Sequence, residues 1–337
     1  MVALAAGYGD PMEKVLVTGA DGFIGSHLVE ALVREGFLVR GLAMYNSLGS
    51  YGWMDESPVL GDVEMVLGDI RDSGTCDDLT QGVDTVYHLA ALIGIPYSYR
   101  APRSYVDTNV HGTVNMCSAA LRSGVSCFIH TSTSEVYGSA ITVPISEGHP
   151  LQPQSPYSAS KIAADALARS YHLSFDLPVV VARPFNTYGP RQSARAIIPS
   201  VVAQLMQGCE VLKVGDTRPT RDLNYVADTV GAFMSIARTP ECVGETLNMG
   251  SGVEISIAHL IRRIQDLLGT DVAVAQEQER LRPESSEVTR LVCDSSRLTE
   301  LTGFRSGTSL DEGLAETLAW FREERNLERY VSNRYVV

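Results

Sequence analysis

We expect this chain of 337 residues to fold as an α/β protein with a doubly wound, mostly parallel sheet. Three observations predict this fold. A glycine-rich turn near the N-terminus follows an apolar segment, strand and helix patterns alternate over the first half of the chain, and the alternation loosens after Arg183. Because alternating strands and helices form βαβ units, the first half predicts a Rossmann-like sheet and the remainder a smaller, discontinuous α/β lobe.

The first strand is predicted at 15–18, where apolar, β-branched residues precede Gly19, Gly22 and Gly25. Residues 26–33 then carry apolar side chains at helical spacing. Glycines at this spacing permit a tight turn, close approach of a pyrophosphate to the backbone and close packing of helix on strand. The helix N-terminus also attracts phosphates through its N–H groups and dipole. This order of strand, turn and helix predicts a dinucleotide-binding site.

The rest of the first half repeats the pattern. Strands are predicted at 37–42, 63–67, 85–91, 127–131 and 179–182, and helices at 104–123 and 157–175. In sheets of this kind the crossovers are right-handed and ligands bind beyond the carboxyl ends of the strands. The residues that follow each strand are therefore the candidates for function.

The second half is less regular. Residues 188–222 are rich in Gly, Pro and Arg, and helices are predicted at 197–206, 255–268 and 310–325. We expect the chain to return to the first domain near 223–250. The predicted division is a leader at 1–12, a nucleotide-binding domain at 13–185 plus about 223–250, a substrate lobe at 186–222 and 251–325, and a tail at 326–337.

The amino-acid composition argues against several kinds of binding partner. The net charge of −13 argues against nonspecific nucleic-acid binding, which needs a basic surface. No apolar run reaches the roughly 18 residues that span a bilayer, and residues 1–13 lack the pattern of a signal peptide. The six cysteines are scattered without a C-x-x-C pair, which predicts reduced thiols and no metal site. We expect a cytoplasmic protein that binds small molecules, with no nucleic-acid or membrane partner.

Chemistry is predicted at two neighbouring segments. Tyr157 and Lys161 stand four residues apart at a helix start, so both lie on one face. We expect the ammonium to lower the pKa of Tyr157 toward the range of a general base, although this spacing also occurs in surface pairs. Residues 131–138 follow a predicted strand with several hydroxyl groups and Glu135, which either enters the ligand crevice or caps a turn.

Taken together, the motifs resemble a known family. The chain is similar to the extended short-chain dehydrogenase/reductases, in the NAD-dependent epimerase/dehydratase group, and most of all to nucleotide-sugar 4,6-dehydratases. The resemblance runs from Lys14 to about Phe321. It rests on T-G-x-x-G-F-I-G, Asp69 after the third strand, Leu89-Ala90-Ala91, Asn109, S-T-S-E-V-Y-G, Y-S-A-S-K and R-P-F-N-T-Y-G-P-R.

The resemblance implies a role for each matched residue. Tyr157 would take the proton of the sugar 4-hydroxyl, Lys161 would hold the nicotinamide ribose, and Thr133 would hydrogen-bond the 4-hydroxyl. The implied catalytic set is Thr133, Ser134, Glu135, Tyr157 and Lys161. The implied cofactor-binding residues are Gly19, Gly22, Phe23, Ile24, Gly25, Asp69, Ile70, Leu89, Ala90, Ala91, Asn109, Tyr157 and Lys161. The implied substrate-binding residues are Asn186, Arg191, Arg221 and Arg282, since guanidinium groups pair with phosphate oxygens.

Glu135 indicates the reaction. In the resembling dehydratases a glutamate here removes the C5 proton once C4 is a ketone, the 6-hydroxyl leaves, and hydride returns to C6 to give a 4-keto-6-deoxy sugar. Ser134 stands where dTDP-glucose dehydratases have an aspartate, so Glu135 itself or Ser134 through water would protonate the leaving group. A UDP-glucuronate decarboxylase and a 4-epimerase remain alternatives within the family. A nucleotide-sensing protein without turnover is the alternative from another class.

Finer features concern substrate, cofactor and assembly. Residues 45–53 and 191–199 resemble N-acetylglucosamine nucleotide dehydratases of the legionaminic-acid type, which implies a UDP- or GDP-N-acetylglucosamine-like substrate. The predicted second strand ends without a carboxylate, and only Arg40 stands nearby, so NAD is expected and NADP stays open. The resemblance also implies a homodimer through a four-helix bundle made by the helices at 104–123 and 157–175.

Overall fold

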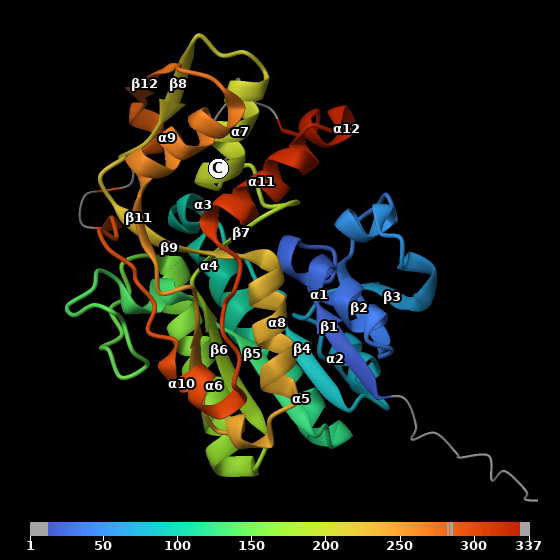
Figure 1. Ribbon diagram of the computed structural model, residues 1–337. Helices are drawn as coiled ribbons and strands as arrows, with labels where there is room; N and C mark the ends of the chain where they lie inside the picture. Colours follow the sequence, from blue (N-terminus) through green and yellow to red (C-terminus); the bar gives the residue numbers. More distant parts are fainter. Residues whose placement is uncertain (1–12, 282, 284–285, 331–337) are drawn as a thin grey trace, which may run out of the picture.

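The computed structural model describes residues 13–281, 283 and 286–330 (Figure 1). The predicted leader at 1–12 and most of the predicted tail lie outside the described residues. A seven-stranded parallel sheet forms the centre, in the order β10-β6-β5-β4-β1-β2-β3. Its strands are β1 (Lys14–Thr18), β2 (Leu38–Met44), β3 (Val63–Gly68), β4 (Thr85–His88), β5 (Cys127–Thr131), β6 (Val179–Pro184) and β10 (Thr246–Met249). The predicted doubly wound parallel sheet is confirmed.

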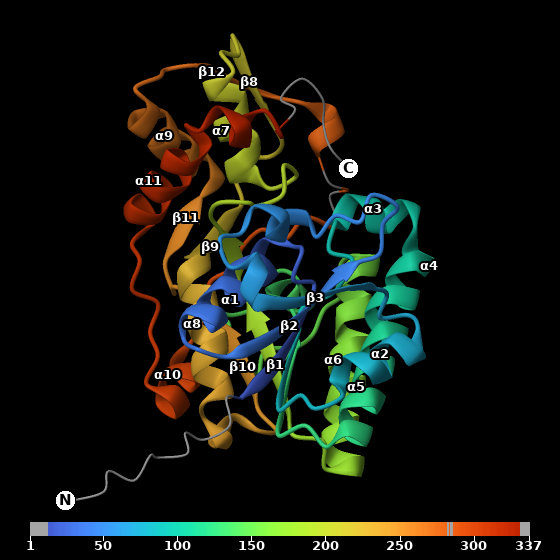
Figure 2. The ribbon, with the colours of Figure 1, turned by 90° about the vertical axis from the view of Figure 1, so that its right-hand side faces the viewer.

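Helices cover both faces of this sheet (Figure 2). On one face lie α1 (Phe23–Arg34), α8 (Val226–Ala237) and α10 (Ser296–Thr302); on the other lie α2 (Ser73–Thr80), α5 (Gly112–Ser123) and α6 (Pro156–Phe175). The strand β1 shows why both faces are apolar: Val15 and Val17 pack in the core with α1, whereas Leu16 between them packs in the core with α5. Successive strand residues point to opposite faces, so a strand covered on both faces is apolar throughout.

The smaller lobe stands above the carboxyl ends of the strands, at the top of Figure 1. Its helices are α7 (Ile197–Met206), α9 (Ile257–Leu268), α11 (Leu310–Phe321) and α12 (Glu324–Leu327). They share a third core with Tyr188, Leu212 and Leu223. Two small sheets complete the lobe, one of β7 (Asn186–Tyr188), β9 (Thr220–Tyr225) and β11 (Glu254–Ser256), the other of β8 (Val211–Val214) and β12 (Ala273–Gln276).

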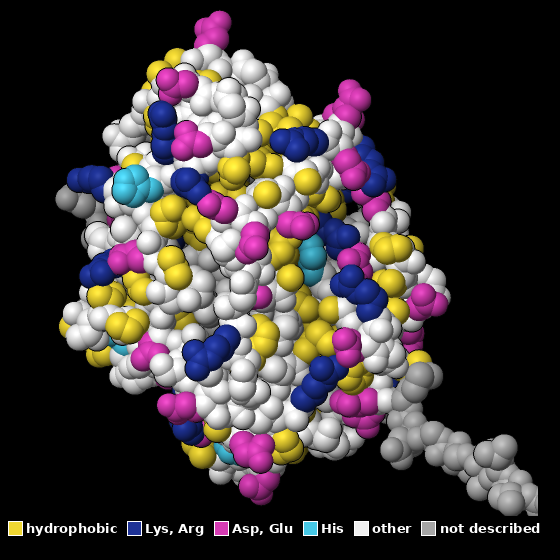
Figure 3. Space-filling view, in the orientation of Figure 1, with side chains coloured by type: hydrophobic (Ala, Val, Ile, Leu, Met, Phe, Trp, Pro, Cys, Tyr) yellow, Lys and Arg dark blue, Asp and Glu magenta, His cyan; other side chains and the backbone are white. Residues whose placement is uncertain are grey.

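The chain crosses between the two parts more than once. After β9 it returns to the large sheet, where β10 pairs with β6 in parallel. Leu298 of α10 also packs in the core around α1 and α8, although it follows the small-lobe strand β12 in sequence. Within the described part of the chain, no helix is long and apolar enough to cross a membrane. Acidic and basic side chains are interspersed on the face shown in Figure 3.

The helix predicted at 104–123 is interrupted. It consists of α4 (Pro102–Tyr105), a π-helical segment at Val106–His111 and α5, and it is preceded by α3 (Ile95–Arg100), which was not predicted. Short 3₁₀ segments lie at Gly52–Glu56 (η1), Leu60–Asp62 (η2), Ser134–Tyr137 (η4), Pro240–Cys242 (η5) and Gln278–Arg280 (η6). Segments with π-helical geometry are frequent at functional sites, and here the segment carries Asn109.

Candidate active site

A cavity of about 920 Å³ lies between the carboxyl ends of the large sheet and the smaller lobe. Residues that follow β1, β3, β4, β5 and β6 line one side, and residues of the smaller lobe, among them Ile197, Pro219 and Arg280, line the other. This is the crevice in which open α/β sheets bind ligands. Its lining is mostly apolar with a few polar groups, as is usual for a small-molecule site.

The glycine turn lines one end of the cavity. Gly19 has φ +72°, and a Cβ on Gly25 would collide with the carbonyl oxygen of Gly19, so the turn needs glycine at both positions. The helix α1 begins at Phe23, directly after the turn, and no side chain caps its N-terminus. Gly19, Gly22, Phe23, Ile24 and Gly25 all line the cavity. An uncapped helix N-terminus behind a bare backbone turn fits a pyrophosphate.

Further residues that the resemblance implies for cofactor binding follow β3 and β4. Asp69, Ile70, Leu89, Ala90 and Ala91 all line the cavity. The side chain of Arg71 hydrogen-bonds both carboxylate oxygens of Asp69, and this interaction lowers the pKa of Asp69 despite partial burial. Thr18 at the end of β1 holds the chain after β4, because Leu89 and Ala90 donate their backbone N–H groups to Thr18 Oγ1 at 3.1 and 3.0 Å.

Asn109 does not line the cavity, but its side chain holds the loop that follows β4. Its Oδ1 accepts from the backbone N–H of Leu92 at 2.8 Å, and its Nδ2 donates to the Leu92 carbonyl and to Ser160 Oγ, both at 2.9 Å. The buried amide therefore connects the strand-end loop to α6. The π-helical turn places Asn109 where its side chain reaches both elements.

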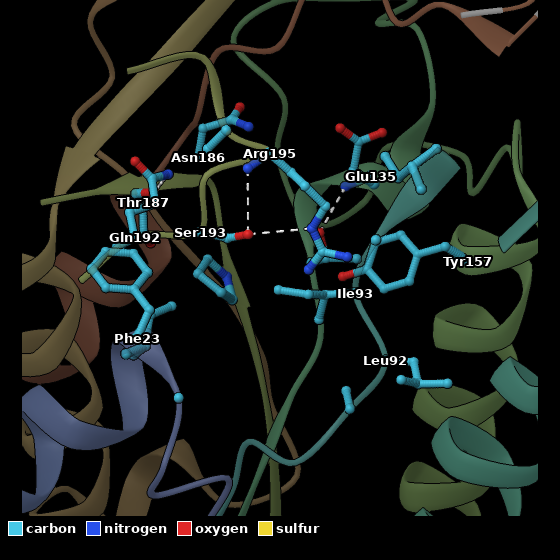
Figure 4. A pocket seen from close by; sticks show the side chains of 18 of the residues that line it. Phe23, Leu92, Ile93, Glu135, Tyr157, Asn186, Thr187, Gln192, Ser193 and Arg195 are labelled. Carbon is cyan, nitrogen blue, oxygen red and sulfur yellow. Dashed lines mark hydrogen bonds between the residues drawn. The ribbon is translucent and has the colours of Figure 1, made fainter. Parts of the chain in front are cut away.

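The expected catalytic residues come together at the centre. Thr133, Ser134, Glu135 and Tyr157 line the cavity, the first three from the segment after β5 and Tyr157 from the start of α6. A Ser155 capping box and Pro156 in the first turn fix that start. Figure 4 places Glu135 and Tyr157 on the same side of the cavity.

The expected lowering of the Tyr157 pKa is wrong for this structure. Burial raises the pKa of Tyr157, the charge of Glu135 adds to the increase, and the hydrogen bond with Thr133 only partly opposes it. Lys161 lies four residues on and is buried too, but its Nζ donates to the carbonyl oxygen of Thr131 at 2.7 Å. Burial lowers the pKa of Lys161 to about 8. Both residues belong to α6, but Lys161 is not among the residues that line the cavity, and the spacing did not show how far burial raises the pKa of the tyrosine.

A buried polar network, which the sequence analysis missed, lies under this pair. Asp165, one turn beyond Lys161, accepts hydrogen bonds from His130 Nε2 at 3.2 Å, Ser132 Oγ at 2.7 Å and Arg183 Nη2 at 2.9 Å. Burial alone would raise the pKa of Asp165, but His130, Arg183 and Lys161 together lower it. The carboxylate in turn opposes the lowering of the Lys161 pKa. The network thus favours the protonated, charged form of Lys161.

The expected substrate residues divide into three cases. Asn186 and Arg221 line the cavity, and Arg221 donates to the Thr220 carbonyl at 2.8 Å and to Glu287 at 3.2 Å. Arg191 is not among the lining residues: it donates to Ser26 Oγ at 3.1 Å and to Glu30 at 2.8 Å. This ion pair holds it against α1, so the structure does not bring it to the predicted substrate site. Arg282 lies outside the described residues.

Several lining residues were not predicted. Arg195 lies against the backbone of Gly94, where a Cβ would collide with its guanidinium, and its Nε donates to Ser193 Oγ at 3.2 Å. Figure 4 shows Arg195 near Tyr157 and Ile93. Arg280, Gln192 and Ser193 line the cavity as well. Only the segment 191–199 was singled out in the sequence, and nothing local in it marks Arg195 as the arginine that reaches the cavity.

Three buried polar atoms on the cavity wall have no hydrogen-bond partner among the described residues. They are Thr131 Oγ1, Asn186 Oδ1 and Gln192 Oε1. A buried polar atom without a partner is costly, so groups of this kind are typical of a site shaped for a polar ligand. Together with the bare glycine turn, these atoms fit a cavity that holds a dinucleotide and a second polar ligand.

Comparison with known proteins agrees with this geometry. Residues 16–317 match the model of the GDP-mannose 4,6 dehydratase family. A dTDP-glucose 4,6-dehydratase of an Actinoplanes strain is 36% identical over 93% of this chain and 99% of its own length. A UDP-N-acetyl-α-D-glucosaminuronate decarboxylase of Bacillus cytotoxicus is 34% identical over 93% of this chain and 99% of its length.

A solved structure is also similar to this chain. DesIV, a dTDP-glucose 4,6-dehydratase of Streptomyces venezuelae solved with NAD and TYD bound, superimposes with a TM-score of 0.83 at 32% identity, over 93% of this chain and 98% of its own. The predicted resemblance is confirmed. The match spans both the large sheet and the smaller lobe, and the chain therefore belongs to the GDP-mannose 4,6 dehydratase family, within the NAD-dependent epimerase/dehydratase superfamily.

Proposed function

We propose that this protein is an NAD-dependent nucleotide-diphosphate-sugar 4,6-dehydratase. One observation carries the proposal: Glu135, a carboxylate, lines the cavity beside Thr133 and Tyr157, and its charge acts on the Tyr157 hydroxyl. An oxidoreductase that moves only a hydride and a proton needs the tyrosine alone. A carboxylate beside it supplies the second base that an elimination requires.

NAD supplies the reversible hydride acceptor that makes C4 of the sugar a ketone and later reduces C6. The protein's own residues carry the proton transfers. Tyr157 takes the proton of the 4-hydroxyl, with Thr133 hydrogen-bonded to the same phenol oxygen. Lys161, kept charged by Asp165, favours the ionised tyrosine once the site is filled. We therefore assign to Tyr157 the role of base in spite of the raised pKa that burial gives it.

Glu135 performs the elimination. The C4 ketone acidifies the neighbouring C5–H, and the carboxylate is then a strong enough base to remove that proton. The C5–C6 double bond forms as the C6–O bond breaks, and the 6-hydroxyl leaves as water after it gains a proton. Either Glu135 itself or Ser134 delivers that proton. Return of hydride to C6 is accompanied by protonation of C5. The two protons taken from the 4-hydroxyl and from C5 thus end in the departing water and in the new C5–H bond, and the net change is the loss of one water.

The substrate is proposed to be a UDP- or GDP-N-acetylglucosamine-like compound. Arg221 and Arg280 line the cavity from the smaller lobe, and we assign to them the binding of the diphosphate, because guanidinium groups pair with phosphate oxygens. Asn186 Oδ1 and Gln192 Oε1 are acceptors without a partner among the described residues, and an acetamido N–H or a sugar hydroxyl would satisfy them. The decarboxylase relative of B. cytotoxicus is named for a substrate of the N-acetylglucosamine type, whereas the Actinoplanes relative and DesIV are named for dTDP-glucose, so the substrate test includes both sugars.

A panel of nucleotide sugars with mass spectrometry tests the function. Incubation with UDP-, GDP-, CDP- and dTDP-linked glucose, mannose and N-acetylglucosamine, and with UDP-glucuronate, is expected to give one substrate whose product is about 18 mass units lighter. Loss of about 44 mass units from a glucuronate substrate would instead identify a decarboxylase. An unchanged mass with inverted C4 would identify an epimerase. Either result refutes the dehydratase proposal.

We further propose a homodimer in which α5 and α6 pair with the same helices of a second copy. The two helices lie side by side on one face of the sheet (Figure 2) and leave Leu121, Leu173 and Phe175 exposed. Light scattering in solution is expected to give twice the mass of the chain. A monomer at micromolar concentration would overturn this part of the proposal without touching the chemistry.

A further inference from the structure

Asp21 is an acidic residue of the glycine turn, and its carboxylate lies at the end of a strand other than the one that the turn follows. It belongs to the connection between β1 and α1, yet its Oδ2 accepts the backbone N–H of Met44, the last residue of β2, at 3.3 Å. Asp21, Leu42 and Met44 all line the cavity, together with Gly68 at the end of β3. The β2 strand itself ends without a carboxylate, and the first turn places one there.

The position of Asp21 is fixed from behind by η1. The backbone N–H of Trp53 donates to the Asp21 carbonyl at 3.1 Å, and Gly52 approaches so closely that a Cβ on it would lie 2.6 Å from that oxygen. Trp53 in turn packs edge-on against Trp320 of α11, with ring centroids 5.7 Å apart. The Asp21 turn is therefore held by η1, and η1 in turn packs against α11.

The arginines near this end of the cavity are already paired. Arg40 is outside the lining and donates to Glu64 and to the carbonyl oxygens of Asp78, Leu79 and Gln81. Arg71 lines the cavity, but its guanidinium binds both carboxylate oxygens of Asp69.

Burial also raises the pKa of Asp21, so its carboxylate gains from any further hydrogen-bond donor. A ligand group that lies between Asp21 and the end of β2 therefore contacts the Asp21 carboxylate, whereas the guanidinium groups of Arg40 and Arg71 already bind other groups.

We propose that Asp21 selects NAD over NADP, as the acceptor for the adenosine ribose hydroxyls. The inference rests on the proposed function, because it needs a dinucleotide on the glycine turn. Nucleotide-binding sheets commonly use an acid that follows the second strand for this purpose; here that strand ends in Met44, and Asp21 reaches the same place from the first turn. A ribose diol offers two O–H donors to the carboxylate, whereas a 2′-phosphate brings like charge against it.

The test measures binding and not turnover. The full-length protein, freed of nucleotide, is titrated with NADH and with NADPH, and the two Kd values come from nucleotide fluorescence. Wild type is expected to bind NADH about a hundredfold tighter, and Asp21→Asn is expected to lower that preference by about tenfold, the scale of one lost like-charge contact. Asparagine keeps an oxygen that accepts the Met44 N–H, so the turn stays supported.

Two further variants make the result specific. Asp62→Asn removes the same charge from η2, outside the cavity lining, and is expected to leave the preference unchanged. Asp21→Ser removes the charge with a smaller side chain, and thermal unfolding with each dinucleotide gives a second measure of preference should Asp21→Asn fold poorly. An Asp21 variant whose preference equals that of Asp62→Asn overturns the inference, as does a wild type indifferent to the 2′-phosphate.

Failure of the inference is distinct from failure of the proposed function. If wild type binds neither dinucleotide, both fall. If wild type prefers NADH, Asp21→Asn loses the preference and no nucleotide sugar loses water, the dehydratase proposal falls while Asp21 keeps its role.

Discussion

Asparagine in place of Asp165 tests the buried network under the proposed active site. The carboxylate of Asp165 is 2% exposed and accepts from His130, Ser132 and Arg183, whose own exposure is 4% or less. An amide keeps one acceptor oxygen but turns an N–H₂ group toward donors and leaves the Arg183 guanidinium without its counter-charge. Breaking a buried ion pair from one side costs about 3–5 kcal/mol, so we expect about 3 kcal/mol for this conservative change, roughly a hundredfold in the folding equilibrium.

Urea unfolding, followed by circular dichroism, measures this loss. Asp107→Asn is the matched control, because Asp107 pairs with Arg103 at 3.7 Å on the surface and its loss is expected to cost under about 0.5 kcal/mol. The pKa of Asp165 is lowered on folding, so its contribution is complete above the unfolded value of about 3.9 and fades as the pH falls toward the folded pKa. The titration of Asp165 itself therefore adds no pH dependence to the difference between wild type and variant above about pH 5. A loss equal to that of Asp107→Asn would refute the reasoning.

Three further predictions follow from the contacts of the site. Gly25→Ala is expected to abolish dinucleotide binding, measured by NADH fluorescence, because the added Cβ collides with Gly19 in the turn; a variant that binds NADH as wild type does would contradict this. Arg221→Ala is expected to raise KM for the nucleotide sugar about tenfold or more, whereas Arg191→Ala, whose guanidinium binds Glu30, changes KM little and lowers stability instead; equal KM effects would contradict this assignment. Arg195→Lys is expected to lower kcat/KM about tenfold, since the planar fork that fits between Ser193 and Gly94 is lost, and unaltered kinetics would contradict a substrate contact.

The large sheet could be predicted because its signals are local. The strand expected at 127–131 and the helix expected at 197–206 have those bounds in the structure, since an apolar run or a periodic one marks each. The π-helical segment at Val106–His111 is different: it carries Asn109, whose hydrogen bonds are to Leu92, a residue outside the helix, and no local pattern marks it. The placement of α10 against α8 likewise depends on a chain return that no local pattern announces.

The same division holds for the site. Gly19, Tyr157 and Glu135 could be found because turn geometry and helical spacing tie their types to their positions. Asp165 escaped notice because an acid in the middle of a helix has no local mark until His130 and Arg183 are folded against it. The Tyr157 pKa was misjudged for a related reason, since desolvation is a property of everything packed around a group and not of its sequence neighbours.

Glu135→Gln provides the most direct measurement of the central claim. With the true substrate, the variant is expected to form NADH in the first half-reaction, because Tyr157 and Thr133 are intact, and then to stop. The account predicts a loss of kcat by about 10²–10⁴, the usual contribution of a general base, with no exchange of the C5 hydrogen into deuterated water. Product formation and C5 exchange at the wild-type rate would contradict it.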